Sequence, residues 1–124
     1  MATWGTRGDQ PDHAERAVSA AAALQTQTAS IASVHPDWPR FRAAVNSGEA
    51  LGVMGAESGR SYTVIGDTVN VAARLEGRAP TGGVVVGGAT LRAVPGLRAT
   101  SLGEVEVKGK REPVDAYLID AQFG

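Results

Sequence analysis

The chain has 124 residues, of which 43% are hydrophobic and 20% are charged, and its formal net charge is −1. We expect one domain over residues 1–124, with a core of mostly Ala, Val, Leu and Ile, because there are only two Trp, two Tyr and two Phe. The absence of cysteine excludes disulfides, thiolate metal sites and a catalytic thiol. Interspersed charges of both signs argue against nucleic acid as a partner, and the longest apolar run is too short to cross a membrane. We therefore expect a cytoplasmic protein.

The first predicted element is a long helix that starts at Asp12 and ends near Val34. Pro11 suits the first turn of a helix, and Asp12 and Glu15 have the spacing of a capping box. A narrow stripe of mostly small residues repeats in steps of four and three along this segment: Ala17, Ala21, Leu24, Thr28 and Ile31. We expect this stripe to pack against a sheet.

Short strands are predicted after this helix. A strand region begins at Phe41–Asn46, and the glycine-rich segment Gly48–Tyr62 is expected to form a hairpin or an extended arm. Val84–Val86 has the composition of a short buried strand, and Ala89–Val94 is expected to form one or two helical turns.

Two more strands are predicted near the C-terminus. Valines alternate with charged residues from Glu104 to Lys108, and apolar residues occupy alternate positions from Val114 to Leu118. An alternation of this kind is typical of half-buried strands. We expect these two strands to pair across the turn Gly109–Pro113.

The most informative segment is YTVIGDTVNVAARLEG, which covers Tyr62–Gly77. It predicts a short strand, a tight turn at Gly66, and a helix capped by Asp67. Asn70 and Arg74 lie four residues apart on this helix, so their side chains point the same way. The segment is thus expected to hold a neutral amide beside a fixed cation.

Each of these polar residues also has an ordinary structural explanation. Asn70 suits a position near a helix cap, and Arg74 could pair with Glu76 or Asp67. The basic turn Lys108–Arg111 is of a kind that is often a solvated loop.

Other candidate motifs are weaker. Gly55–Ser61 is similar to a phosphate-binding loop, but it has three residues between its glycines instead of four, and Arg60 where that loop needs lysine. The two histidines, His13 and His35, lie at opposite ends of the predicted long helix. Neither a histidine metal pair nor a Ser-His-Asp triad is therefore expected.

The segment Tyr62–Gly77 closely resembles the signature of the class III adenylyl and guanylyl cyclases. The resemblance continues in the family's order through DHAERAV (12–18), AAVNSGEALGVMG (43–55), TGGVVVGGAT (81–90) and LGEVEVKGKREPVDAYLI (102–119). It implies an α+β, ferredoxin-like fold with a mostly antiparallel sheet and helices packed on it. In that family the hairpin segment is an arm that contacts a second subunit.

The resemblance also implies a reaction, in which a ribose 3′-hydroxyl attacks the α-phosphate of ATP or GTP to form a cyclic nucleotide and pyrophosphate. Such transfers are catalysed mainly by positioning and by electrostatic stabilisation of the phosphoryl oxygens. By motif position, Arg74 would stabilise the transition state and Asn70 would hold the ribose oxygen. Thr63 occupies the position that reads the purine, and Lys108 occupies the position that contacts the triphosphate.

The metal-binding part of the family has no counterpart in this sequence. In the family, two metal-binding aspartates and an adenine-selecting lysine precede the point that matches the start of this chain, and Met1–Gly5 resembles the strand after the second aspartate. No Asp or Glu precedes Asp9. The family thus implies Mg²⁺ or Mn²⁺, but we expect their ligands to be absent from this chain. We expect an N-terminally truncated domain that is inactive alone and binds ATP or GTP weakly.

Two functions are consistent with these features. In the first, the chain is one half of a composite catalytic site, completed by a second copy or by another cyclase domain. In the second, it is a non-catalytic cyclase-like module for regulation or dimerisation.

The family's first strand lies in the middle of the sheet, so we expect its place to be filled by Met1–Thr6, by the arm Gly48–Tyr62 or by a second copy. A homo-oligomer, most simply a dimer, is the expected state.

Overall fold

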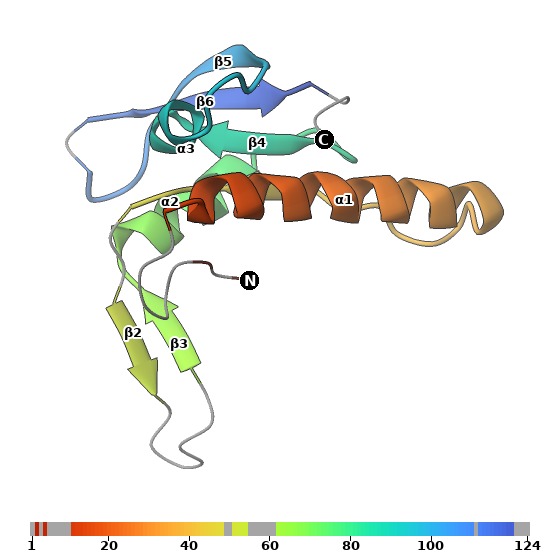
Figure 1. Cartoon of the computed structure of the whole chain (residues 1–124), viewed down its shortest axis with the longest axis horizontal. Coiled ribbons are helices and arrows are strands. Elements are labelled where there is room, and N and C mark those ends of the chain that lie inside the picture. Colours follow the sequence, from red (N-terminus) through yellow and green to blue (C-terminus); the bar gives the residue numbers. More distant parts are fainter. Residues whose placement is uncertain are drawn as a thin grey trace.

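The computed structural model describes residues 2, 4, 11–48, 51–54, 62–110 and 112–120, and for residues 51–54 and 62–65 it describes the backbone alone. The described part contains three helices and six strands (Figure 1). In chain order they are α1 (His13–Val34), β1 (Ala43–Val45), β2 (Leu51–Met54), β3 (Tyr62–Ile65), α2 (Asp67–Glu76), β4 (Val84–Gly87), α3 (Gly88–Ala93), β5 (Ala99–Val105) and β6 (Val114–Ile119).

A four-stranded sheet in the order β1-β4-β6-β5 forms the centre of the domain. β1 runs parallel to β4, whereas β4 and β6, and β6 and β5, pair antiparallel. β2 and β3 form a separate antiparallel hairpin that projects away from the sheet (Figure 1). The expected α+β fold with a mostly antiparallel sheet is confirmed, with one parallel pairing that the sequence pattern did not predict.

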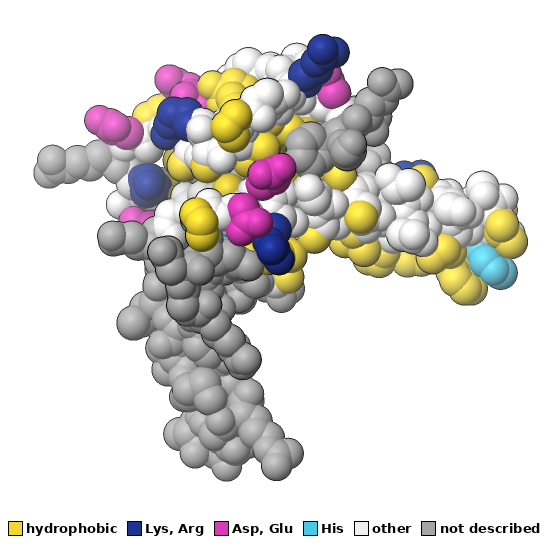
Figure 2. Space-filling model, in the orientation of Figure 1, with side chains coloured by type: hydrophobic (Ala, Val, Ile, Leu, Met, Phe, Trp, Pro, Cys, Tyr) yellow, Lys and Arg dark blue, Asp and Glu magenta, His cyan; other side chains and the backbone are white. Residues whose placement is uncertain are grey.

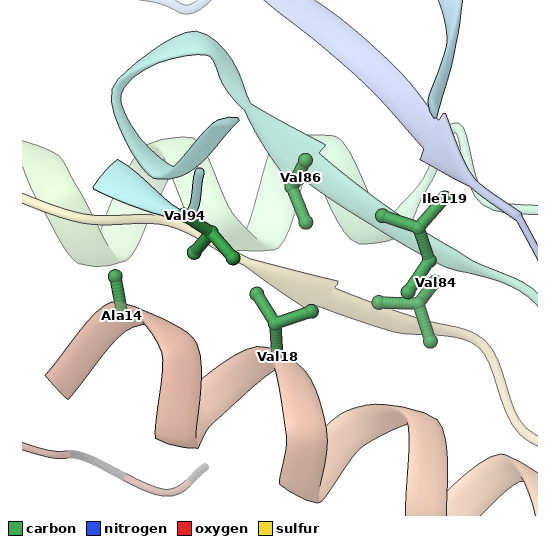
Figure 3. Packing of buried hydrophobic residues seen from close by; sticks show 6 residues of the cluster. All are labelled: Ala14, Val18, Val84, Val86, Val94 and Ile119. Carbon is green, nitrogen blue, oxygen red and sulfur yellow. The ribbon is translucent and has the colours of Figure 1, made fainter. Parts of the chain in front are cut away.

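The two faces of the sheet are covered by different helices. On one face, Ala14 and Val18 of α1 pack on Val84 and Val86 of β4 (Figure 3). Val94, which follows α3, and Ile119, the last residue of β6, complete this cluster. On the other face, α2 packs on Val85 of β4. β4 is therefore buried along its whole length, which explains its uninterrupted run of valines.

The helix that carries the candidate site is held by the second cluster. Val71 and Leu75 of α2 pack with Val85 of β4, Val105 of β5 and Ala116 of β6. Burial of each such valine or leucine side chain contributes roughly 1.5–3 kcal/mol. This contact fixes which side of α2 remains exposed.

The expected stripe on α1 is only partly right. Ala17 is buried, but Leu24 and Ile31 are 50% and 42% exposed. The inward face passes instead through Gln25, whose Nε2 donates hydrogen bonds to the carbonyl oxygens of Phe41 (2.9 Å) and Gly83 (2.8 Å). The prediction failed at Leu24 because a polar residue that bonds two backbone carbonyls can lie inward as well as an apolar one.

Both predicted side-chain caps are wrong. Asp12 is the N-cap of α1, but its carboxylate makes no capping bond and accepts a hydrogen bond of 2.7 Å from Nε of Arg16 instead. This hydrogen bond lowers the pKa of the Asp12 carboxyl below its ordinary value. The N-cap of α2 is Gly66, which leaves Asp67 as the first helical residue without a capping bond.

The remaining predicted elements are confirmed with shifted ends. The hairpin pairs Leu51 with Ile65, and β5 and β6 pair Val105 with Val114. β5 ends before Lys108 and begins as early as Ala99. The loop Gly55–Ser61 lies outside the described residues, as does the strand expected at Met1–Thr6, apart from Ala2 and Trp4, which are not in a strand.

Candidate active site

The turn into α2 is made by Gly66. Its φ of 133° lies in the region that favours glycine, and its carbonyl oxygen accepts hydrogen bonds from the backbone N–H groups of Val69 (3.1 Å) and Asn70 (3.3 Å). Because Val71 and Leu75 face the sheet, Asn70 and Arg74 remain on the exposed side of the helix. The structure thus places these two residues one turn apart on one helix, as their spacing predicts.

Arg74 contacts the residue that follows β5. Its Nε donates a hydrogen bond of 3.2 Å to the carbonyl oxygen of Glu106. Among the described residues the one salt bridge joins Arg16 to Asp12, so Arg74 does not pair with Glu76 or Asp67. The guanidinium is therefore oriented by a neutral carbonyl group, and its charge is not neutralised by a described carboxylate.

A cavity of about 630 Å³ lies beside this arginine. Arg74 and Lys108 both line this cavity, together with Glu106, Val107, Gly109, Lys110 and Pro113. Lys110 is a residue that the sequence reasoning did not select, although it stands in the same basic turn. Among the described lining residues, three cations and one acidic residue give this cavity a positive balance, which suits an anionic ligand.

Asn70 is not among the described residues that line this cavity. Asn70 is exposed and lies one turn before Arg74 on α2. Thr63 lies in β3, where its backbone pairs with Val53, and the position of its side chain is outside what the structure describes.

A second cavity, of about 640 Å³, lies between the start of α2, the start of α3 and the turn between β5 and β6. Lys110 and Pro113 line both cavities. The second cavity is also lined by Arg92 and three acidic residues, Asp67, Glu112 and Asp115, so its described lining has no excess of positive charge. An anionic ligand is therefore better matched by the cavity beside Arg74.

The described residues do not offer a site that fits a catalytic metal. No three His, Cys, Asp or Glu residues among them lie close enough together to hold an ion. In the same part of the chain, no helix is both long and apolar enough to cross a membrane.

Comparison with known proteins identifies the family. Residues 1–121 match the family profile described as "Adenylate and Guanylate cyclase catalytic domain", and the chain belongs to this family. It is 33% identical over 128 aligned residues, or 96% of this chain, to adenylate cyclase 1 of Rhizobium meliloti (strain 1021). It is 36% identical over 90 residues, or 68% of this chain, to a receptor-type adenylate cyclase of Trypanosoma congolense.

Solved structures show the same fold. The adenylyl cyclase CyaB from P. aeruginosa matches with a TM-score of 0.79 at 24% identity, over 94% of this chain and 64% of that one. The guanylyl cyclase Cya2 matches with a TM-score of 0.76 at 26% identity, over 94% of this chain and 62% of that one. The chain spans 19% of the Rhizobium relative and 12% of the Trypanosoma relative.

Proposed function

We propose that the chain is a class III nucleotide cyclase domain that provides the Asn70–Arg74 side of a composite site. The reaction is the conversion of ATP or GTP to a cyclic nucleotide and pyrophosphate, as part of intracellular signalling in the cytoplasm. The observation that carries the proposal is that Arg74, oriented by the Glu106 carbonyl, lines one positively charged cavity with Lys108.

The chemistry follows from these charges. The ribose 3′-oxygen forms a bond to the α-phosphorus and loses its proton, while the bond from that phosphorus to the pyrophosphate oxygen breaks. Negative charge develops on the non-bridging oxygens of the α-phosphate, where a fixed guanidinium stabilises the transition state. In this proposal Arg74 supplies that charge, Asn70 holds the ribose oxygen, Lys108 binds the polyphosphate and Thr63 contacts the purine.

A second domain completes the site in this proposal. Mg²⁺ or Mn²⁺ is implied by the family. Its ligands would come from the partner, which is a complete cyclase domain. The metal would supply charge neutralisation of the triphosphate. The contribution of this chain is then the helix α2 and the turn that carries Lys108.

The chain alone is expected to form no measurable cyclic nucleotide from ATP or GTP with magnesium or manganese. Its charged groups bind phosphate, but the described residues include no carboxylate cluster for the metal. The test is to assay the homogeneous 124-residue chain alone and after mixing with a complete cyclase domain. Robust cyclic AMP or cyclic GMP formation by the chain alone, lost in Arg74→Ala, would show that the site is not shared.

ATP is expected to bind the isolated chain weakly, with a Kd on the order of 1 mM. Exposed cations in water attract a triphosphate, but without a metal they neutralise only part of its charge. Isothermal calorimetry at low salt measures this affinity, and the Arg74→Ala/Lys108→Ala double variant serves as the comparison. Micromolar binding, or equal binding by the double variant, would contradict the assignment of this cavity to the triphosphate.

A non-catalytic module for regulation or dimerisation is the second candidate. The large apolar side chains exposed along α1, Leu24, Ile31 and Val34, favour a docking role. In that case the wild-type chain would change the rate of cyclic nucleotide formation by a complete cyclase domain after mixing. The Arg74→Ala variant of the chain would change that rate by the same amount. An effect that depends on Arg74 favours the catalytic role instead.

A further inference from the structure

Hydrogen bonds and apolar packing, and not ion pairs, join the described elements of the molecule. Among the described residues the one salt bridge lies at the start of α1, between Arg16 and Asp12. Charged side chains of both signs are scattered over the face of the molecule that Figure 2 displays. In this part of the chain the position of α2, which carries the candidate active site, is therefore set by packing and by hydrogen bonds.

Asn46, the residue that follows β1, is bonded to the first turn of α2. Its Nδ2 donates a hydrogen bond of 3.0 Å to the carbonyl oxygen of Thr68, across a separation of 22 residues in the chain. Both residues are half-buried. Thr68 lies two positions before Asn70, so this bond holds the end of α2 on which Asn70 stands.

Two glycines leave room for this contact. The side-chain oxygen Oδ1 of Asn46 lies so close to Gly87, the last residue of β4, that a Cβ there would come within 2.5 Å of it. A Cβ at Gly48 would come within 2.7 Å of Oγ1 of Thr68. Atoms in a folded chain do not approach so closely, so a side chain at either glycine would displace Asn46 or Thr68.

The next residue, Ser47, is bonded to a different helix. A hydrogen bond of 2.8 Å joins its Oγ to Oγ1 of Thr90 in α3. Thr90 is buried, and its Oγ1 also donates a hydrogen bond of 3.5 Å to the carbonyl oxygen of Val45. Two neighbouring residues thus contact two different helices, Asn46 the helix of the candidate site and Ser47 the helix α3.

The described contacts hold α2 at both ends and in its middle. Asn46 bonds the first turn, Val71 and Leu75 pack on the sheet, and Arg74 bonds the carbonyl oxygen of Glu106 near the C-terminal end. Apolar packing is non-directional, whereas a hydrogen bond depends on distance and angle. The hydrogen bonds at the two ends therefore decide where α2 lies along its own axis.

We propose that Asn46 is a positioning residue of the candidate active site, which sets the place of α2 on the sheet and through it the places of Asn70 and Arg74. The inference rests on the proposed function, because it gives Asn46 a role in the same reaction. Asn46 acts through Thr68 and does not contact the nucleotide. A displacement of about 1 Å in a group that orients a substrate can lower a rate by about 100-fold.

Nuclear magnetic resonance of the 124-residue chain alone tests the positioning. The reporter is the Nε–H proton of Arg74, which is bonded to the carbonyl oxygen of Glu106 at 3.2 Å. In Asn46→Ala and Asn46→Asp, which both remove the donor and of which the second keeps the side-chain shape, this proton should exchange with water about fivefold faster or more. Both variants give the same prediction although they change the volume differently.

Ser47→Ala is the matched control. It removes one side-chain hydrogen bond from the same segment, but the bond leads to α3 and not to α2. A urea midpoint measured for each variant shows whether the losses of stability are comparable. The Nε–H exchange of Arg74 should stay within about twofold of the wild type in this control, because a general loss of stability would affect both variants alike.

The rate of cyclic nucleotide formation is the second readout, measured in a mixture with a complete cyclase domain whose own counterpart of Arg74 has been replaced by alanine. Asn46→Ala should lower kcat about tenfold or more with little change in KM, and Ser47→Ala should lower it less than about threefold.

The two readouts separate this inference from the proposed function. Unchanged Nε–H exchange in both Asn46 variants, or a kcat that Asn46→Ala lowers no more than Ser47→Ala, would overturn the role of Asn46. Faster Nε–H exchange in the Asn46 variants of a chain that restores no activity to the mixture would support the positioning of α2 by Asn46 and contradict the proposed function.

Discussion

Replacing Arg74 with alanine should lower cyclic nucleotide formation by about 100- to 1,000-fold, measured in a mixture with a complete cyclase domain whose own counterpart of Arg74 has been replaced by alanine. Loss of one preorganised group that stabilises transition-state charge has an effect of this size. The structure adds that the guanidinium is oriented by the carbonyl oxygen of Glu106 at 3.2 Å. Arg74→Lys should therefore recover only part of the rate, because a lysine keeps the charge but not the fork of donors.

Arg78 provides the matched control for this result. It is an exposed arginine just after the same helix, its Nη2 donates a hydrogen bond of 3.4 Å to the carbonyl oxygen of Leu102, and it does not line the cavity beside Arg74. Arg78→Ala should change the rate by less than about threefold, as surface substitutions have small effects. Equal losses in the two alanine variants would mean that a general change of charge, and not the position of Arg74, sets the rate.

Replacing Gln25 with leucine should lower the free energy of unfolding by about 2 kcal/mol. Gln25 is 6% exposed, and its side-chain amide donates hydrogen bonds to the carbonyl oxygens of Phe41 and Gly83, which precede β1 and β4. Each carbonyl also accepts a hydrogen bond from a backbone N–H, so neither is left without a partner in the variant. The hydrogen bond of 3.3 Å that Oε1 of Gln25 accepts from Oγ1 of Thr28 is lost as well. A change of this size is a large part of the stability of a small domain.

Urea unfolding at a fixed protein concentration measures this effect, since association would otherwise change the apparent stability. Gln27→Leu is the control, because Gln27 is exposed on the same helix and carries the same side chain. It should alter the free energy of unfolding by no more than about 0.5 kcal/mol. If the two variants unfolded at the same urea concentration, the two bonds of Gln25 would not hold α1 to the sheet.

The segment around α2 could be predicted from the sequence because its information is local. Spacing along one helix places Asn70 and Arg74 on one side, and the apolar positions Val71 and Leu75 decide which side is buried. The hairpin of β2 and β3 is likewise a connection between neighbouring segments. Such features follow from residues close together in the chain.

The features that could not be predicted depend on contacts between distant segments. Gln25 bonds a carbonyl 58 residues away, and no pattern of apolar spacing contains that information. The parallel pairing of β1 with β4 also joins segments separated by the hairpin and α2. At the ends of helices, the prediction failed for a different reason: Arg16 takes the carboxylate of Asp12 that the capping box requires.

The cavity beside Arg74 contains one lysine that could be predicted from the sequence and one that could not. Lys108 could be selected from its position in the resembled family, and the structure brings it beside Arg74. Lys110 was missed because its position in the turn only gains meaning once β5 and β6 fold the turn against α2. A second lysine in the same short turn was the available signal.

The most direct test of the proposed catalytic role is the rescue of a complete cyclase domain whose own counterpart of Arg74 has been replaced by alanine. That domain is mixed with the wild-type 124-residue chain, or with its Arg74→Ala variant, and cyclic nucleotide formation is measured with magnesium. We expect the wild-type chain to restore activity at least about tenfold above the crippled domain, and the variant to restore none. Equal rates with both chains, or no rescue by a wild-type chain that binds the domain, would contradict a role for Arg74 in a shared site.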